Sequence, residues 1–292
     1  MIRVHRGPEP EKLQKVRLEK HPGLARIAKK RPPLSNEIDG YKVVAHDLWS
    51  AQQYKCCYCE RKIACPYNDV EHYRPKASAT RHPGSTATHG YWWLAFTWEN
   101  LLFACPMCNR SGKNDLFPLE LGSVALAAPV APPGKEVPLF IDPSCESGVE
   151  HIEFVFSIIP SKTPVHRGSD AWTARKHWWP RARGGSKKGD WTIRVCRLDH
   201  ADFVEPYDDH VNKEVRPVTA DLLEAIQKRQ DVPAQFNVAM RLLQPGKAYV
   251  GLSFDALRIL VPPAKLAPWK LAWPEPREVG RALQPKRRRS RT

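Results

Sequence analysis

The chain has 292 residues, of which 42% are hydrophobic, and carries 46 Lys and Arg against 31 Asp and Glu. This length and composition predict a folded protein of one or two domains and exclude a disordered chain. The formal net charge of +15 favours a polyanionic partner, most commonly nucleic acid, and a basic surface kept only for solubility is the alternative.

Membrane and secretory segments are absent from the pattern of the sequence. No stretch approaches the ~18 apolar residues that a membrane span requires, and the first residues, MIRVHRGPEPEK, lack the apolar region of a secretory signal. We therefore expect a cytoplasmic protein without a membrane partner. Thiols stay reduced in that compartment, so the eight cysteines suggest metal binding rather than a disulfide framework.

The N-terminal half of the chain is expected to carry the functional motifs. Residues 1–40 are basic and interrupted by prolines, which is typical of an arm or a partner-binding segment. Residues 43–55 have apolar side chains at near-helical spacing and predict an amphipathic helix at the start of a motif-bearing domain, 41–121. The segment GSVALAAPVAPPGKEVP, 122–138, is rich in breakers and predicts a linker or a long crossing loop.

The C-terminal half, 139–285, is expected to form a mixed accessory domain. LFIDPS (139–144) and HIEFVFSII (151–159) are rich in strand-forming residues, whereas 220–230 and 234–244 have helical periodicity. The fold class predicted for the whole chain is therefore α+β.

Two basic segments of this half are candidate contact surfaces. HWWPRARGGSKKGDWTIR, 177–194, predicts an aromatic, glycine-containing loop that binds either nucleic acid or a partner protein. Its candidate contact residues are Arg181, Arg183, Lys187 and Lys188. The last residues, 286–292, form a basic tail that adds at most a nonspecific electrostatic attraction.

Four of the cysteines form two C-x-x-C pairs, Cys56–Cys59 in CCYC and Cys105–Cys108 in CPMC. Each pair can present two thiolates to one metal ion, and the four together make the closed tetrahedral set of a structural zinc site. A redox role for the first pair is the alternative, which the second pair disfavours. The other cysteines lack partners at such spacing and are expected to be buried or incidental thiols: Cys57, Cys65, Cys145 and Cys196.

Polar residues with catalytic potential lie between and beyond the two pairs. They are Glu71 and His72 in VEHYRPK, Asn100 in FTWENLLFACPMCN, and Asn109 directly after the second pair. Hydrolysis of a phosphodiester requires a base for water and a cation at the developing charge. Imidazole suits the base because its unperturbed pKa of about 6.5 lies near working pH. Carboxylate and amide oxygens are hard ligands that suit Mg²⁺ or Mn²⁺.

The order Glu71-His72, Asn100, Asn109 within a frame of C-x-x-C pairs resembles the HNH endonuclease family, whose core is a ββα-metal (His-Me) finger. The patterns CCYCER, VEHYRPK and YWWLAFTWENLLFACPMCNRSGKNDLFPL are similar to those of HNH nucleases in Septu-type and retron-linked anti-phage systems. These patterns cover residues 56–119, and PLFIDPS with EHIEF extends the likeness to about residue 155. The resemblance implies a zinc-stabilised ββα-metal core followed by the mixed accessory domain.

Carried over residue by residue, the resemblance implies that His72 is the general base that activates water. Glu71 and Asn109 would bind a catalytic Mg²⁺ or Mn²⁺ at positions where many family members have Asp and His. Asn100 would fix the loop that bears His72. Four basic residues beside these motifs could hold substrate phosphate: Arg74, Lys76, Arg110 and Lys113.

Each of these residues also has an interpretation without catalysis. His72 could be an ordinary histidine, Asn109 a helix cap after the cysteine pair, and Asn100 a cap of the next segment. The four basic residues could form a solvated face. The aromatic cluster YWWLAFTW, 91–98, favours core packing against the zinc finger over base stacking.

The predicted function is that of a metal-dependent HNH endonuclease acting on nucleic acid, with DNA favoured over RNA. The resemblance also implies an ATPase partner in a defence complex. The alternatives are an RNA nuclease that uses the same site and a zinc-stabilised nucleic-acid-binding module without catalysis.

Overall fold

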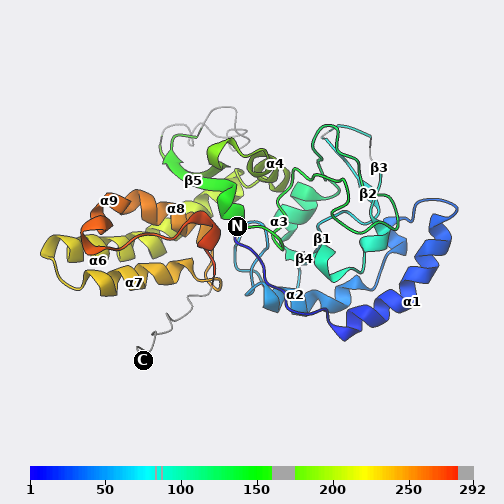
Figure 1. Cartoon of the computed structure of the whole chain (residues 1–292), viewed down its shortest axis with the longest axis horizontal. Coiled ribbons are helices and arrows are strands. Elements are labelled where there is room, and N and C mark those ends of the chain that lie inside the picture. Colours follow the sequence, from blue (N-terminus) through cyan, green and yellow to red (C-terminus); the bar gives the residue numbers. More distant parts are fainter. Residues whose placement is uncertain (83, 87, 160–174, 282–292) are drawn as a thin grey trace, which may run out of the picture.

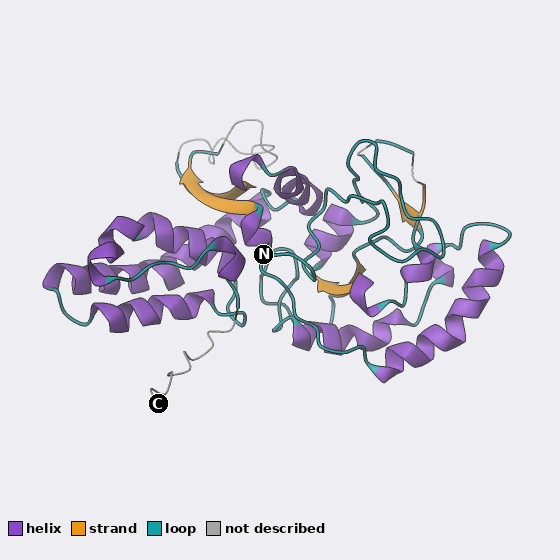
Figure 2. Ribbon diagram, in the orientation of Figure 1, coloured by secondary structure: helices purple, strands orange, loops and turns teal. Residues whose placement is uncertain are grey.

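The computed structural model describes residues 1–82, 84–86, 88–159 and 175–281. Within these residues the chain combines many helices with three antiparallel sheets of two strands each (Figure 1), which confirms the predicted α+β class. Figure 2 shows that helices dominate the lobe formed by the C-terminal half, whereas long loops surround the strands of the N-terminal half. None of the helices in the described ranges is long and apolar enough to span a membrane. The basic tail, 286–292, lies outside them.

The N-terminal segment packs onto the molecule, in contrast to the arm expected for residues 1–40. Its main element, α1 (Glu11–Ala28), buries Leu13 and Leu24 in a hydrophobic cluster that also contains Val70 of the first strand. Most other side chains of α1 are exposed or partly exposed, and many are basic. The segment has the composition of an arm because only two side chains of the helix, Leu13 and Leu24, are buried.

Two strands and a short helix form the centre of the N-terminal lobe. β1 (Asp69–His72) pairs antiparallel with β4 (Leu101–Ala104), so that His72 lies opposite Leu101. α3 (Pro106–Cys108) follows β4 directly and continues into a wider π-type turn, η5 (Asn109–Lys113). All four residues of β4 are buried, as expected for a strand formed by an uninterrupted apolar run.

Smaller elements surround this centre. α2 (Ala45–Ala51) packs beside β4 and is shorter than the helix predicted over 43–55, because the 3₁₀ turn η2 (Tyr41–Val44) precedes it. β2 (Ser78–Ala79) and β3 (Thr88–His89) pair antiparallel in the insert between β1 and β4. Gly90 permits this close pairing, since a Cβ there would lie 2.6 Å from the carbonyl carbon of Ala77.

The aromatic cluster of residues 91–98 packs into the core, as the sequence favoured. Trp93, Phe96 and Trp98 are buried. The indole nitrogens still find partners, because Trp98 donates to the backbone oxygen of Gly7 and Trp93 donates to that of Val130. These side chains therefore tie the N-terminal segment and the loop 122–138 to the centre of the lobe.

The segment 122–138 is a crossing loop with a buried anchor. The side chain of Glu136 is fully buried and accepts hydrogen bonds from Nε of Arg74 at 2.7 Å and from Oη of Tyr91 at 2.5 Å. Leu126 is buried in the same loop, and its backbone N–H also donates to Glu136. Of the two structures that the sequence allowed, the crossing loop is the one observed.

The C-terminal half begins with a loop where a strand was predicted. Residues 139–144 form no strand, because their polar groups bond to side chains: Oδ1 of Asp142 accepts from the backbone N–H of Ser144, and Ile141 N–H donates to Oγ1 of Thr192. The prediction for 151–159 is confirmed by β5 (Ile152–Ser157). It pairs antiparallel with β6 (His177–Ala182).

The prediction of a loop over residues 177–194 was wrong, whereas a contact role for this segment stays a prediction. These residues form β6, a short turn and α4 (Lys187–Cys196), whose first turn is capped by Ser186. The four basic side chains are ion-paired within the chain, as Arg181–Glu153, Arg183–Asp255, Lys187–Glu120 and Lys188–Glu146. Glycines and cations favoured an open loop by composition, but these carboxylates come from distant segments that the local sequence does not reveal.

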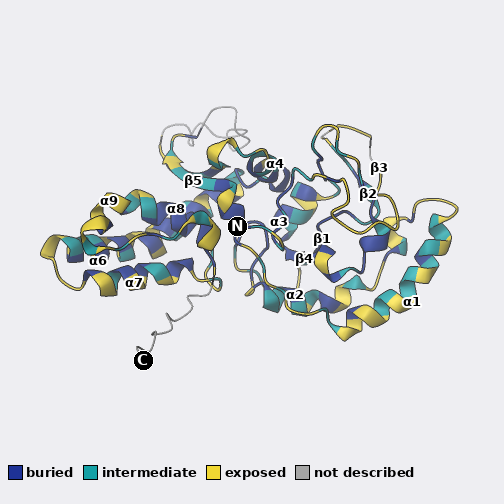
Figure 3. Ribbon diagram, in the orientation of Figure 1, coloured by how far each residue is buried: buried dark blue, intermediate teal, exposed yellow. Residues whose placement is uncertain are grey.

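The remaining helices complete the C-terminal lobe. They are α5 (Ala201–His210), α6 (Arg216–Lys228), α7 (Val232–Met240), α8 (Val250–Leu260) and α9 (Pro263–Leu266). The helices predicted over 220–230 and 234–244 are confirmed in α6 and α7. α8 is buried along most of its length (Figure 3), and its side chains belong to the same hydrophobic cluster as Cys56 and Cys108. The two halves therefore share one continuous core.

Candidate functional site

The four cysteines predicted to bind zinc lie together. The sulfur atoms of Cys56, Cys59, Cys105 and Cys108 all lie within 4.8 Å of one another, and all four residues are buried. One pair follows α2 and the other spans the junction of β4 and α3, so the long insert between the pairs begins and ends at this cluster. Such an all-thiolate group can hold zinc in a closed tetrahedral site.

The chemistry of this cluster fits a metal cation. Burial raises the pKa of the Cys108 thiol, because a buried thiolate loses its hydration. A bound Zn²⁺ neutralises such thiolates and converts its binding energy into folding energy. Cys57 and Cys196 are also buried, whereas Cys65 is partly exposed and Cys145 is exposed. Cys196 belongs to α4, so the C-terminal half covers the cluster.

A polar cavity of about 290 Å³ lies at the end of β1. It is lined by Glu71, His72 and Asn109, three of the four residues predicted to act in catalysis. Its other polar lining residues are Ser35, Tyr41, Lys76, Ser78, Asn114 and Asp115. The structure thus brings together the predicted base and the two predicted metal ligands, while Asn100 lies outside the lining.

Glu71 is buried with a cationic partner. Its Oε1 lies 2.6 Å from Nζ of Lys113 and 3.3 Å from Oη of Tyr58, which donates to it. Burial raises the pKa of the Glu71 carboxyl above its usual value, because the charged form loses hydration, while Lys113 opposes this effect. Tyr58 lies between Cys57 and Cys59, so the cysteine loop itself helps to orient Glu71.

His72 is held in one tautomer. Its Nε2 lies 3.0 Å from the backbone oxygen of Ala95. Since a carbonyl oxygen only accepts hydrogen bonds, Nε2 carries the hydrogen and donates it, and Nδ1 remains the proton acceptor. The ring of Tyr41 packs edge-on against it, with the two ring centroids 4.5 Å apart.

The basicity of His72 differs from the value assumed from the sequence. Burial lowers the pKa of His72 to about 3, and the positive charges of Lys76 and Lys113 act in the same direction. The residue is only 6% exposed, and removal of water disfavours the imidazolium form. The ring is therefore neutral and able to accept a proton throughout the ordinary pH range, although as a weaker base than free histidine.

Asn100 fixes the backbone that follows His72. Its Oδ1 accepts from the backbone N–H of Arg74 at 2.8 Å, and its Nδ2 donates to the backbone oxygens of Arg74 and Leu94 at 3.1 and 3.2 Å. Its own backbone oxygen accepts from the N–H of Tyr73 at 2.9 Å. The buried amide therefore holds the residues immediately after β1 from both sides.

Asn109 lies where α3 gives way to η5. Its Nδ2 donates to Oδ2 of Asp69 at 3.2 Å, and its backbone N–H donates to Cys105 at 3.0 Å. The side-chain bond is made to a carboxylate on β1 rather than to a free backbone group at a helix end. This contact orients Asn109 toward the strand that carries Glu71 and His72.

Two of the four basic residues predicted to hold phosphate are buried and paired. Arg74 contacts Glu136 in the crossing loop, and Lys113 contacts Glu71. Lys113 is 0% exposed, and its Nζ also donates to the backbone oxygen of His72 at 2.8 Å. Neither Arg74 nor Lys113 is among the residues that line the cavity.

The other two basic residues are accessible. Lys76 lines the cavity, and its Nζ donates to the backbone oxygens of Ser35 and Ile38, both at 2.9 Å. Burial lowers the pKa of Lys76 to about 8. The side chain of Arg110 is 66% exposed and forms two hydrogen bonds with the carboxylate of Asp69, at 2.9 and 2.6 Å.

Several residues of this region were not singled out from the sequence. Asp69 and Glu71 alternate along β1 and therefore face the same side of the strand, a spacing that could have identified Asp69. Asp115 lines the cavity and accepts hydrogen bonds from the hydroxyls of Ser78 and Thr80. No spacing in the sequence indicates that contact, because the folding of the insert creates it.

Comparison with known proteins gives one informative similarity. The chain is 36% identical over 154 residues to the Septu protein PtuB of Bacillus mycoides (strain KBAB4). The match covers 52% of this chain and 45% of that protein, so the chain spans about half the length of the curated relative that it matches. Neither a protein-family model nor a solved structure matches the chain.

Proposed function

We propose that this protein is a metal-dependent endonuclease of the HNH type that hydrolyses phosphodiester bonds in nucleic acid, with DNA as the favoured substrate. The observation that carries the proposal is the cavity shared by Glu71, His72 and Asn109. The order of β1, β4 and α3 is that of a ββα-metal finger, which supports the same assignment. The cysteine cluster would hold these elements together with one structural zinc ion.

His72 would act as the general base. Its Nδ1 takes a proton from water, the water oxygen attacks the phosphorus, and the bond between phosphorus and the 3′-oxygen breaks. The leaving oxygen takes a proton from solvent, so the products carry a 5′-phosphate and a 3′-hydroxyl. The imidazolium that forms on His72 then gives its proton to solvent, which restores the base.

Glu71 and Asn109 would hold the catalytic Mg²⁺ or Mn²⁺. Both line the cavity, and a carboxylate and an amide supply the hard oxygen ligands that these ions prefer. When bound, the cation supplies Lewis-acid stabilisation of the charge on the phosphate and the leaving oxygen. Lys113 would keep the Glu71 carboxylate oriented, and Asn100 would keep the backbone after His72 in place.

Lys76 and Arg110 are the basic residues that we assign to substrate phosphate. Lys76 lines the cavity, and the exposed guanidinium of Arg110 can exchange Asp69 for a phosphate group. Arg74 and Lys113 would instead act on the site through the residues that they contact, since their charges are matched by buried carboxylates.

We also propose that the nuclease is the effector of an anti-phage defence system and acts with an ATPase partner. The similarity to a Septu protein supports this context. Purification of the tagged chain after co-expression with a neighbouring ATPase should yield a complex. If the ATPase is soluble and folded but does not co-purify with the tagged chain, the partnership is contradicted. The nuclease assignment does not depend on this result.

Substitution of the proposed base tests the function directly. The variant His72→Ala should lose at least ~10²-fold of the Mg²⁺-dependent cleavage of plasmid DNA, because general bases contribute about that much. Zinc content and melting temperature should stay near those of the parent. His89→Ala, at an exposed histidine on β3, is the matched control and should cleave normally.

The same assay separates the rival functions. Cleavage of transfer RNA with an intact plasmid would reassign the substrate to RNA and keep the site. If His72→Ala cleaved both substrates as well as the parent, the proposed mechanism would fall. If the parent bound nucleic acid but cleaved none with Mg²⁺ or Mn²⁺, the chain would be a zinc-stabilised binding module.

A further inference from the structure

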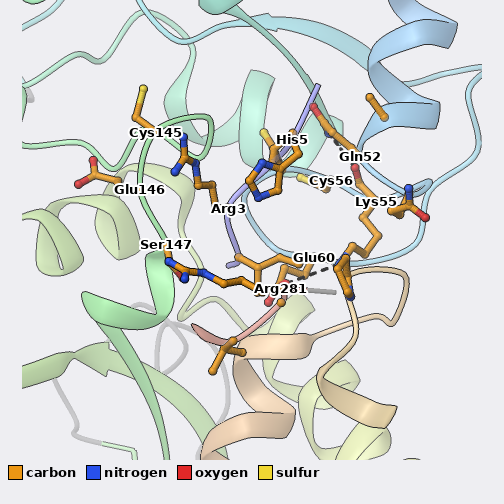
Figure 4. A pocket seen from close by; sticks show the side chains of 18 of the residues that line it. Arg3, His5, Gln52, Lys55, Cys56, Glu60, Cys145, Glu146, Ser147 and Arg281 are labelled. Atoms are coloured by element: carbon orange, nitrogen blue, oxygen red, sulfur yellow. Dashed lines mark hydrogen bonds and ion pairs between the residues drawn. The ribbon is translucent and has the colours of Figure 1, made fainter. Parts of the chain in front are cut away.

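A second cavity, of about 620 Å³, lies apart from the proposed catalytic cavity (Figure 4). Four segments and Pro245 line it: the segments are the N-terminal residues 2–5, the cysteine loop and its approach within 51–60, residues 145–150, and the C-terminal residues 277–281. Figure 4 shows side chains from all four of these segments around one space. No residue of this cavity takes part in the proposed hydrolysis.

The walls of the cavity are fixed by close backbone contacts. Gly280 has a φ of +78°, and a Cβ at this position would lie 2.8 Å from side-chain atoms of Ile2. Glu60 accepts a hydrogen bond from the backbone N–H of Gly251 at 2.9 Å, and a Cβ on Gly251 would lie 2.9 Å from the backbone nitrogen of Met1. The N-terminal and C-terminal segments are thus held together by glycine-dependent packing, and the space between them is preformed.

The charged groups of this cavity favour an anionic ligand. Arg277, Arg281 and His5 have no ion-pair or side-chain hydrogen-bond partner within the described part of the chain, and Arg3 donates only to the backbone oxygen of Ser144. The buried carboxylate here is Glu60: its Oε2 pairs with the N-terminal ammonium at 2.8 Å, and its Oε1 lies 3.7 Å from Nζ of Lys55 without accepting a hydrogen bond.

The other carboxylates of the lining do not offset the three guanidinium groups. Glu146 is paired with Lys188 at 2.8 Å and lies 3.3 Å from Nε2 of His151. Those hydrogen bonds hold the pKa of Glu146 at about 2, although burial alone would raise it. Glu150 is exposed at the edge of the cavity. The lining therefore presents an excess of positive charge that internal ion pairs do not consume.

The basic side chains of the lining are accessible to a ligand. Arg3, His5, Arg277 and Arg281 are all exposed, and they come from both terminal segments. Ser147 also lines the cavity, but its Oγ is buried beneath the surface, so the guanidinium groups are the donors that a ligand meets.

We propose that this cavity binds a phosphorylated small molecule of nucleotide size. Guanidinium groups bind phosphate oxygens in a two-point geometry, and three of them, on Arg3, Arg277 and Arg281, line the cavity. The volume lies within the range typical of small-ligand pockets. Ile2, Val4 and Val279 provide an apolar wall for the part of the ligand that carries no charge.

A strand of nucleic acid fits these observations less well. Its phosphates would require an extended basic surface, whereas the unpaired cations here surround a single cavity. The binding function is also separate from hydrolysis, since the two cavities share no lining residue. The proposal therefore stands or falls independently of the nuclease assignment.

Calorimetric titration of the full chain with ATP in the absence of divalent cations tests the proposal. ATP and ADP should bind, and adenosine should not, because the guanidinium groups recognise phosphate. The double variant Arg277→Ala/Arg281→Ala should weaken ATP binding at least about tenfold. Arg241→Ala removes an exposed cation outside the cavity and should bind ATP like the parent.

Two further variants separate ligand binding from folding and from catalysis. Arg3→Ala should weaken ATP binding severalfold without lowering the melting temperature, since this exposed side chain bonds only to the backbone oxygen of Ser144. His72→Ala should bind ATP normally.

Three results would overturn the proposal. The first is failure of the parent to bind ATP or ADP. The second is ATP binding that the double variant leaves unchanged. The third is that the parent binds a single-stranded oligonucleotide, that ATP does not compete with the oligonucleotide, and that the double variant no longer binds it. This result would assign the surface to nucleic acid.

Discussion

The cysteine cluster and the Glu71–His72 cavity are built on the same elements, but the cluster is closed and the cavity is open. The four sulfur atoms face one another, are buried, and can occupy every position around a metal ion. The cavity beside them has polar walls and encloses about 290 Å³ of open space. A closed ligand set stabilises a fold, whereas a catalytic site must keep positions free for its substrate.

The two regions are also physically connected. Tyr58, between two cysteines of the loop, donates to Glu71, and Asn109 follows Cys108 directly. The closed cluster therefore determines where two residues of the open cavity lie. This connection explains how a lobe with short strands can fix the side chains that line the cavity. The variants below test it, beginning with the largest expected effect.

Loss of a cysteine ligand should have the largest effect. Cys105→Ser should release zinc, measured by metal analysis, and lower the free energy of unfolding by about 4 kcal/mol or more. Cleavage should fall with it, because Glu71 and Asn109 lose their support. Cys65→Ser, at a partly exposed cysteine outside the cluster, is the matched control. Unchanged stability of Cys105→Ser would mean that the cluster holds no structural metal.

Removal of the buried cation behind Glu71 should come next. Lys113→Met leaves a buried carboxylate without its partner, and breaking such a pair costs about 3–5 kcal/mol. Denaturant unfolding measures the loss. The double variant Lys113→Met/Glu71→Gln should regain much of this stability, because the uncompensated charge is gone, yet it should remain inactive. If the double variant were no more stable than the single one, Lys113 would act by packing alone.

Loss of the buried amide should have an intermediate effect. Asn100→Ala removes three hydrogen bonds to the backbone around Arg74 and Leu94, and should lower the free energy of unfolding by about 3 kcal/mol. Cleavage should decrease while zinc is retained, which distinguishes this variant from Cys105→Ser. Asn68→Ala loses exposed bonds to Ala64 and Pro66 and should be nearly neutral. An equal loss in both variants would contradict a special role for Asn100.

The parts of the site that the sequence predicted are those encoded by local spacing. Two C-x-x-C pairs specify a metal cluster wherever the chain brings them together, and the long insert does not weaken that inference. The proximity of Glu71 and His72 to Asn109 followed from the same frame. The two helices over 220–230 and 234–244 were predictable because their apolar period is long and regular.

The parts that were not predictable depend on partners distant in the chain. Lys113 and Arg74 resembled phosphate-binding residues because their buried carboxylates, Glu71 and Glu136, lie far away in sequence. Composition alone likewise suggested an open loop for β6 and α4, since the carboxylates that pair with their cations come from other elements. A cation close to a motif shows charge, but only the fold shows whether that charge is already matched.

Arg110 offers the smallest and most selective test of this difference. Its pair with Asp69 is exposed, so Arg110→Ala should change the free energy of unfolding by less than about 1 kcal/mol, in contrast to Lys113→Met. Affinity for DNA should nevertheless fall, and the salt dependence of binding should weaken by roughly one phosphate contact. Lys228→Ala breaks another exposed ion pair, with Glu224 on α6, and should leave DNA binding unchanged. Equal DNA binding by the parent and Arg110→Ala would assign Arg110 to the fold alone and leave Lys76 as the basic residue that meets substrate in the cavity.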